Sequence, residues 1–131
     1  MKFYVASSFK NIDKVRYVSK QLAQRGFTLT YDWTNPGEAL TLERLKEIGQ
    51  LEKRAVSEAY VVIVLLPAGK GSHIELGLAL GFEKKIILYA PDDEVNQIEK
   101  TSTFYQLDEV GQCIGTLDEL IDYVTATSIR V

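Results

Sequence analysis

The sequence has little of what disulfides and soft metal sites require. It contains one cysteine, Cys113, and one histidine, His73. A single cysteine cannot form a disulfide within the chain, and these two residues do not supply the usual ligand set of a zinc site. We therefore expect neither a bound metal nor another cofactor.

Charge of one sign and long apolar runs are also scarce. The chain has 15 basic and 18 acidic residues, for a net charge of −3, and they show no strong clustering. A nucleic-acid surface would show a basic stripe, so a nucleic-acid polymer is not an expected partner. The longest later apolar run, residues 59–68, is far shorter than a membrane span, and no cationic leader follows Met1. These absences predict a cytoplasmic protein that does not enter a membrane.

What the sequence does contain is a regular alternation of strand and helix patterns. Its hydrophobic content of 46% and charged content of 25% are typical of a globular protein. Strands alternating with helices favour a parallel sheet with right-handed crossovers. We predict one domain over residues 1–131, an α/β/α three-layer fold whose five-stranded parallel sheet has the flavodoxin-like, doubly wound order. The predicted strands are 2–7, 27–32, 60–66, 85–90 and 111–114.

Helical periodicity fills the intervals between these strands. It runs from Val15 to a stop at Gly26, and then over 41–58, 73–82 and 116–124, where Thr116 and Glu119 have the spacing of a capping box. The tripeptide Asn35-Pro36-Gly37 predicts a loop, whereas the polar stretch 91–100 predicts no definite element. In such sheets ligands bind beyond the carboxyl ends of the strands, so the loops after the first three strands are the places to examine.

The loop after the third strand has the composition of an anion site. Gly69, Lys70, Gly71 and Ser72 offer backbone N–H groups, a cation and a hydroxyl where a helix begins. It is not a Walker A loop, because that motif needs a glycine where this chain has Val64 and a serine or threonine directly after the lysine. The alternative is a tight strand-to-helix turn that binds nothing.

Glu75 is the strongest candidate for a catalytic carboxylate, since it opens an apolar helix directly beyond the central strand. Ser72 and Glu75 also match the S-x-x-E capping box, in which the glutamate only binds back to the backbone N–H of Ser72. His73, beside them, could contact a phosphate, or it could have a structural role.

Polar and aromatic side chains also follow the first two strands. Ser7 and Ser8 could bind a ribose or a phosphate, and the ring of Phe9 could stack on a base. Asp32 could act as an acid or base, with Trp33 as an aromatic wall. In the alternative interpretation Ser8 or Asn11 only caps the next helix and Trp33 covers the core.

Two segments resemble one enzyme family. Residues 2–9, KFYVASSF, resemble the opening K-I-Y-L-A-S/G-P-F of the nucleoside 2-deoxyribosyltransferases. Residues 71–81, GSHIELGLALG, followed by KKII at 84–87, are similar to the segment G-T-x-x-E-x-G-x-A-x-A-x-G-K-P-I of the same family. The resemblance spans roughly the first 90 residues. TIR domains share the strand order and a comparable glutamate-bearing helix.

The resemblance implies a chemical role for Glu75. The matching glutamate in that family is the nucleophile at the anomeric carbon of a nucleoside or nucleotide, and the glycosyl group then passes to a base or to water. A second acid must protonate the leaving base, and Asp32 is the candidate. Tyr4 or Ser7 could orient the sugar.

This chain departs from the family after the third strand. The base-exchanging members carry aspartates there, whereas this sequence has Leu66-Pro67 and Gly69-Lys70. The difference speaks against base exchange, and Lys70 favours a phosphorylated substrate that is hydrolysed. The expected function is therefore cleavage of an N-glycosidic bond or 2-deoxyribosyl transfer.

Two alternatives to this function remain. The missing aspartates also suit a non-catalytic module that binds or senses nucleotides, and the likeness to TIR domains suggests an NAD hydrolase. All three interpretations take a nucleoside, a nucleotide or an NAD-like small molecule as the partner. Because small folds of this kind often complete their site across a dimer, the resemblance adds a homodimer to these expectations.

Overall fold

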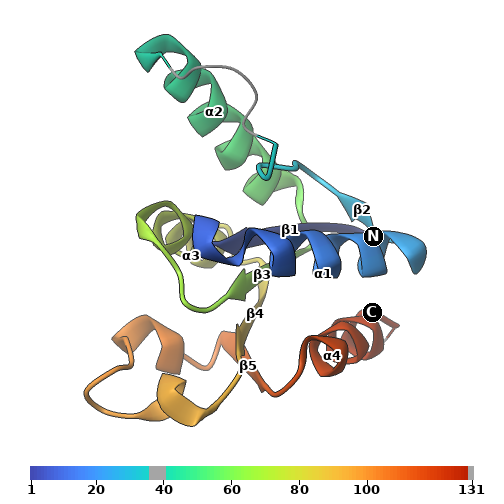
Figure 1. Ribbon diagram of the computed structural model, residues 1–131, viewed down its shortest axis with the longest axis vertical. Coiled ribbons are helices and arrows are strands. Elements are labelled where there is room, and N and C mark those ends of the chain that lie inside the picture. The colour runs from blue at the N-terminus through green and yellow to red at the C-terminus, as the bar shows by residue number, and fades with distance from the viewer. Residues whose placement is uncertain (36–40, 130–131) are drawn as a thin grey trace.

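The computed structural model describes residues 1–35 and 41–129, which form a sheet covered by helices (Figure 1). The strands are β1 Lys2–Ser7, β2 Thr28–Leu29, β3 Val61–Leu65, β4 Lys85–Ala90 and β5 Val110–Ile114. The α-helices are α1 Ile12–Gln24, α2 Leu42–Glu58, α3 Lys70–Gly81 and α4 Leu117–Ile129. Three 3-10 turns complete the described part: η1 Phe9–Asn11, η2 Asp93–Asn96 and η3 Thr103–Gln106.

The five strands have the order β2-β1-β3-β4-β5, and every pairing between neighbours is parallel. This arrangement confirms the predicted flavodoxin-like order. The connections reverse direction between β1 and β3, so the switch point where such sheets bind ligands lies between these two strands. All five residues of β3 are buried, which explains its continuous apolar sequence.

Each face of the sheet packs against two helices and forms its own core. On one face Val18 and Leu22 of α1 and Leu120 of α4 pack against the sheet. On the other face Val56 of α2 and Leu76 of α3 do the same. Tyr4 lies in this second core, so its side chain points toward α2 and α3.

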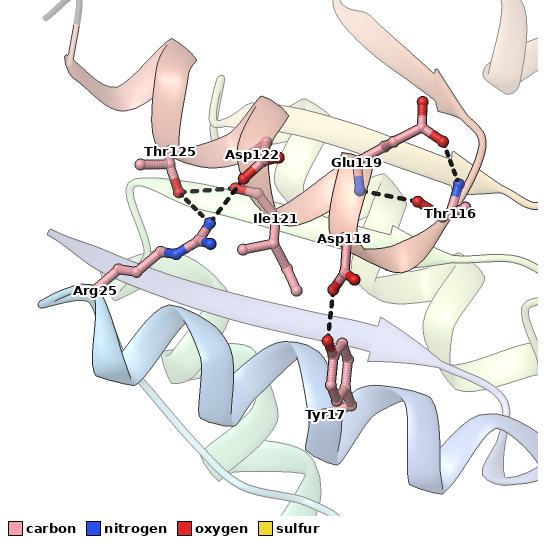
Figure 2. A network of polar contacts seen from close by, with 8 residues as sticks. All are labelled: Tyr17, Arg25, Thr116, Asp118, Glu119, Ile121, Asp122 and Thr125. Carbon is pink, nitrogen blue, oxygen red and sulfur yellow. Dashed lines mark hydrogen bonds and ion pairs between the residues drawn. The ribbon is translucent and has the colours of Figure 1, made fainter.

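Polar contacts join α1 and its C-cap residue, Arg25, to α4 on the first of these two faces (Figure 2). The hydroxyl of Tyr17 donates to Oδ1 of Asp118 at 2.5 Å, and Arg25 pairs with Oδ1 of Asp122 at 3.2 Å. At the start of α4 the backbone N–H of Glu119 donates to Oγ1 of Thr116 at 3.1 Å. In return the N–H of Thr116 donates to Oε1 of Glu119 at 3.0 Å, which confirms the predicted capping box.

The second strand is much shorter than predicted. The prediction gave residues 27–32, whereas β2 has only two residues. Beyond the strand, Asp32 accepts a hydrogen bond from the backbone N–H of Thr34 at 2.9 Å and so turns the chain. The predicted loop at Asn35-Pro36-Gly37 runs into residues 36–40, which lie outside the described residues.

Two other boundaries differ from the prediction. Helix α3 begins at Lys70, three residues before the predicted start, because Gly69 is its N-cap. The segment between β4 and β5, which had no definite prediction, contains η2 and η3. No helix among the described residues is long and apolar enough to cross a membrane.

Candidate active site

The central feature of the site is a buried carboxyl group held by a tyrosine. Tyr4 lies in the middle of β1 and is completely buried, and Glu75 on α3 has only 6% of its surface exposed. The Tyr4 hydroxyl donates a hydrogen bond to Oε2 of Glu75. Strand β1 and the first turns of α3 therefore fix this carboxyl group on the α2 and α3 side of the sheet.

Burial changes the acidity of both groups. It raises the pKa of Glu75 to about 8, the hydrogen bond from Tyr4 opposes the rise, and the charge of Glu52 adds to it. The pKa of Tyr4 is raised as well, first by burial and then by the charge of Glu75. The tyrosine therefore remains a neutral hydrogen-bond donor at physiological pH.

A second carboxyl group faces this pair from α2. Glu52 is half-buried and interacts with both Glu75 and Tyr4, and burial raises its pKa while these interactions oppose the rise. Two carboxyl groups that interact in this way exchange protons as a pair, with pKa values that belong to the pair. Burial thus favours the protonated form of both carboxyl groups, and the two groups interact with each other.

The sequence prediction missed Glu52, although a signal was present. It lies three and four residues before Ala55 and Val56, which are both buried against the sheet. Residues at this spacing share one face of a helix. A carboxylate on the buried face of an amphipathic helix needs a polar partner, and that requirement could have marked Glu52 as a candidate.

The way α3 begins explains why the Glu75 carboxyl group is not used to cap this helix. The Ser72 hydroxyl accepts from the N–H of Gly69 at 2.6 Å and donates to the carbonyl of Gly69 at 3.0 Å. Ser72 is therefore the third residue of the helix and not its N-cap. The predicted Ser72 to Glu75 capping box is wrong, because Gly69 caps the helix and the Glu75 carboxyl group binds Tyr4 instead.

The same helix start carries the predicted anion-binding groups. The first N–H groups of a helix, here including those of Lys70 and Gly71, have no acceptor within the helix. Lys70 is exposed and adds a positive charge. A Cβ atom built on Gly69 would lie 3.9 Å from both Cα and Cβ of Ser8, so the loop after β1 lies against this loop. The structure therefore brings Ser8 and the Gly69 loop together, as predicted.

Ser7 joins these two loops through hydrogen bonds. Its hydroxyl donates to the carbonyl of Leu65 at 2.8 Å and accepts from Nδ2 of Asn11 at 3.0 Å. The side chain of Asn11, which is buried at the N-cap of α1, makes no capping hydrogen bond and also donates to the carbonyl of Pro67 at 3.2 Å. Ser7 and Asn11 thus hold the end of β1 against the loop that follows β3.

Asp32, which the sequence suggested as the acid, belongs to a turn. Its Oδ1 accepts from the N–H of Thr34, and its Oδ2 accepts from Nδ2 of Asn35 at 3.1 Å. No hydrogen bond in the described structure joins it to Tyr4 or Glu75. The side chain stabilises the turn after β2, and we consider Glu52 the better candidate for the acid.

Two aromatic rings lie beside the carboxyl end of β1. The indole N–H of Trp33 donates to the carbonyl of Val5 at 2.7 Å. The rings of Trp33 and Phe9 meet edge to face, with their centroids 5.4 Å apart and an interplanar angle of 85°. Phe9 is 66% exposed, so much of this residue is accessible to a ligand.

His73 does not join the Tyr4 and Glu75 pair. Its Nδ1 lies 2.8 Å from the carbonyl oxygen of Gly69, and its Nε2 lies 2.6 Å from the hydroxyl of Tyr105. Two residues along a helix correspond to a rotation of roughly 200°, so His73 and Glu75 lie on opposite sides of α3. No group of three metal-ligating side chains occurs within 1–35 and 41–129.

Comparison with known proteins identifies the fold. Neither a protein-family model nor a curated protein sequence matches this chain. Among solved structures, the fold is similar to that of the CMP N-glycosidase BcmB from Clostridium botulinum. The two chains are 16% identical, the match covers 95% of this chain and 99% of the other, and the TM-score is 0.64. The likeness shows a distant relationship in fold to this nucleotide N-glycosidase, and the function must be argued from the site.

Proposed function

We propose that this protein hydrolyses the N-glycosidic bond of a nucleotide, with Glu75 as the nucleophile and Glu52 as the acid and base. The observation that carries the proposal is the buried Glu75 carboxyl group, which accepts a hydrogen bond from Tyr4 and interacts with Glu52 near the switch point of the sheet. Glycosidases use two carboxyl groups that flank the bond to be broken. The fold shared with BcmB supports the same class of reaction.

In the first step the Glu75 carboxylate attacks the anomeric carbon of the sugar. Because Oε2 holds the hydrogen bond from Tyr4, Oε1 is the attacking oxygen. The bond between the anomeric carbon and the base nitrogen breaks, its electron pair goes to the nitrogen, and the proton of Glu52 neutralises the leaving base. An ester between Glu75 and the sugar results.

In the second step water attacks the same carbon. The Glu52 carboxylate takes the proton of the water, the ester bond breaks, and the Glu75 carboxylate is restored. The Tyr4 hydroxyl keeps its hydrogen bond throughout. It orients Glu75 and stabilises the negative charge of this carboxylate before the attack and again as the ester bond breaks. The cycle returns one proton to the carboxyl pair.

The groups around the pair match the parts of a nucleotide. The N–H groups at the start of α3, the side chain of Lys70 and the neighbouring Ser8 suit a phosphate. The exposed Phe9 beside Trp33 suits the base. A phosphorylated substrate is therefore preferred over the free nucleoside.

The test is an assay for a released base. The purified protein is incubated with pooled ribo- and deoxyribonucleosides, their monophosphates and NAD, and the products are separated by chromatography and identified by mass. We expect a free base from a monophosphate with wild type and a rate at least about 10³-fold lower with Glu75→Ala. Glu58→Ala, at an exposed position on α2, is the control for mutation of a glutamate.

The alternative outcomes separate the remaining interpretations. Release of nicotinamide alone would replace this proposal with an NAD hydrolase. Unchanged substrates, together with a thermal shift by one of them, would replace it with a binding module.

A further inference from the structure

A cavity of about 300 Å³ lies beside the candidate active site, on the β4 side of the loop that follows β3. This volume falls at the lower end of the range for small-molecule pockets, roughly 300 to 1,000 Å³. Leu66, Pro67 and Ala68 form one wall, and Pro91 and Val95 belong to the apolar wall after β4. The remaining lining residues are Ala90, Asp92, Glu94, Lys100 and Tyr105.

Two of the polar residues that line the cavity, Lys100 and Glu94, form a donor and acceptor pair. Nζ of Lys100 lies 3.0 Å from Oε1 of Glu94, and both side chains are more than half exposed. An ammonium group can only donate and a carboxylate can only accept. Neighbouring groups of this kind match a ring edge that carries an acceptor next to an N–H donor. The cyclic amide and amidine edges of nucleobases have this pattern.

Tyr105 lines the cavity and carries a hydroxyl that can accept a hydrogen bond. The carbonyl of Gly69 can only accept, so the Nδ1 of His73 that contacts it carries the hydrogen. Nε2 of the neutral ring is then bare, and it accepts from the Tyr105 hydroxyl at 2.6 Å. The tyrosine oxygen keeps its lone pairs for a donor on a ligand. His73 thereby determines the polarity that Tyr105 presents.

We propose that this cavity is a second ligand site, separate from the Glu75 site, which takes a planar heteroaromatic ring of nucleobase size. The apolar walls would contact the two faces of the ring, while Lys100, Glu94 and Tyr105 would bind its polar edge. The choice of a nucleobase among planar rings rests on the proposed function, because a free base is its product. The existence of the site does not depend on turnover.

A ligand in this cavity would contact the loop that follows β3, because Leu66, Pro67 and Ala68 of this loop line the cavity. Pro67 lines the cavity, and its carbonyl accepts the hydrogen bond from Asn11 that helps to hold β1 against this loop. The backbone of Gly69 contacts His73, the partner of Tyr105. A bound base would therefore contact the segment that positions the start of α3.

The experiment measures binding of uracil by calorimetry and by amide chemical shifts, with Glu75→Gln as a protein that cannot turn over. We expect saturable binding at about millimolar concentration or below, with shifts at Ala68, Val95 and Tyr105. The ring 1,3-dimethyluracil has no N–H, so it should bind at least about tenfold more weakly. Uracil binding to wild type should match that to Glu75→Gln.

Two variants test the location of the site. Lys100→Met and Tyr105→Phe, which keep most of each side chain, should each weaken uracil binding about tenfold. Lys20→Met, at an exposed position on α1, should not change it. Absence of saturable binding, equal binding by Lys100→Met, or loss of binding in Glu75→Gln alone would each overturn the proposal. Failure of the proposed function would instead appear as base binding without any cleavage of nucleotides.

Discussion

The hydroxyl of Tyr4 donates a hydrogen bond to Oε2 of Glu75 across 71 positions of the chain. Both groups are buried, with Tyr4 completely enclosed and 6% of Glu75 exposed. A buried carboxylate without a donor would incur its full desolvation cost. The tyrosine therefore reduces the cost of ionising Glu75, although burial still raises the pKa of this carboxyl group to about 8.

Replacement of Tyr4 by phenylalanine removes this donor and leaves the ring in place. The pKa of Glu75 should rise further, because the hydrogen bond that lowers it is lost. We expect turnover of the nucleotide to fall roughly 10- to 100-fold and the pH optimum to move upward. The measurement is kcat as a function of pH. An unchanged pH optimum would show that Tyr4 does not act on the carboxyl pair.

Replacement of Glu52 by glutamine tests the acid role. The leaving base would lose its proton donor, so turnover of a natural nucleotide should fall by about 10² to 10⁴. A substrate with a 4-nitrophenolate leaving group needs no protonation, and its cleavage should be affected much less at the first step. Comparable losses on both substrates would assign Glu52 to binding or folding and not to proton transfer.

The raised pKa of Glu75 predicts how stability depends on pH. Its folded-state pKa of about 8 exceeds the ordinary value of 4.5, so the native state holds this proton more tightly than the unfolded chain does. The contribution to stability is fully present below about pH 4.5 and is lost as the pH rises through about 8. We expect Glu75→Gln to melt higher than wild type at pH 9, with a smaller difference at pH 5. Glu58→Gln, at an exposed position, is the matched control.

The aromatic pair after β1 and β2 predicts an effect on substrate binding. Phe9 is 66% exposed, so Phe9→Ala should leave the melting temperature nearly unchanged. Stacking of a ring on a base contributes about 1 to 3 kcal/mol, which corresponds to a rise in KM of roughly 5- to 160-fold. Phe104→Ala, at a phenylalanine on η3 that is 58% exposed, should not change KM. Equal KM values for wild type and Phe9→Ala would remove Phe9 from the site.

The contacts in Figure 2 predict unequal effects on stability. Thr116 completes a reciprocal cap at the start of α4, so Thr116→Ala should cost about 1 kcal/mol and lower the melting temperature by roughly 4 °C. Arg25 forms an exposed ion pair with Asp122, and Arg25→Ala should cost no more than about 0.5 kcal/mol. Thermal unfolding at one pH compares them. A larger loss from Arg25→Ala would show that the ion pair, and not the cap, holds α4.

The fold could be predicted because its signals are local and repeated. The apolar run of β3, the glycine after α1 and the Thr116 capping box each depend on neighbouring residues, and the alternation of strands and helices fixes a parallel sheet. The start of α3 could not be placed in this way. The pattern from Ser72 to Glu75 fits a capping box that would make Ser72 the N-cap. In the structure Gly69 is the N-cap, and Ser72, from within the helix, accepts a hydrogen bond from the backbone N–H of Gly69.

The candidate site was predictable only in part, because it depends on packing between distant elements. Glu75 could be identified from its place after the central strand. The role of Glu52 depends on which face of α2 meets Tyr4, and this is set by how the helix packs on the sheet. Asp32 was a candidate acid because it ends a predicted strand, but its carboxylate oxygens accept hydrogen bonds from Thr34 and Asn35 in its own turn.

The hydrogen bond between Trp33 and Val5 has a consequence for how the protein meets other chains. Strand β2 pairs only with Lys2 and Phe3, so within residues 1–35 and 41–129 the remainder of β1 has no neighbouring strand on that side. The indole N–H occupies the carbonyl of Val5 at this margin. Unpaired strand margins are templates for aggregation, and bulky side chains that cover them oppose the addition of a foreign strand. The ring beside the candidate site thus occupies an acceptor that a foreign strand would need in order to pair with β1.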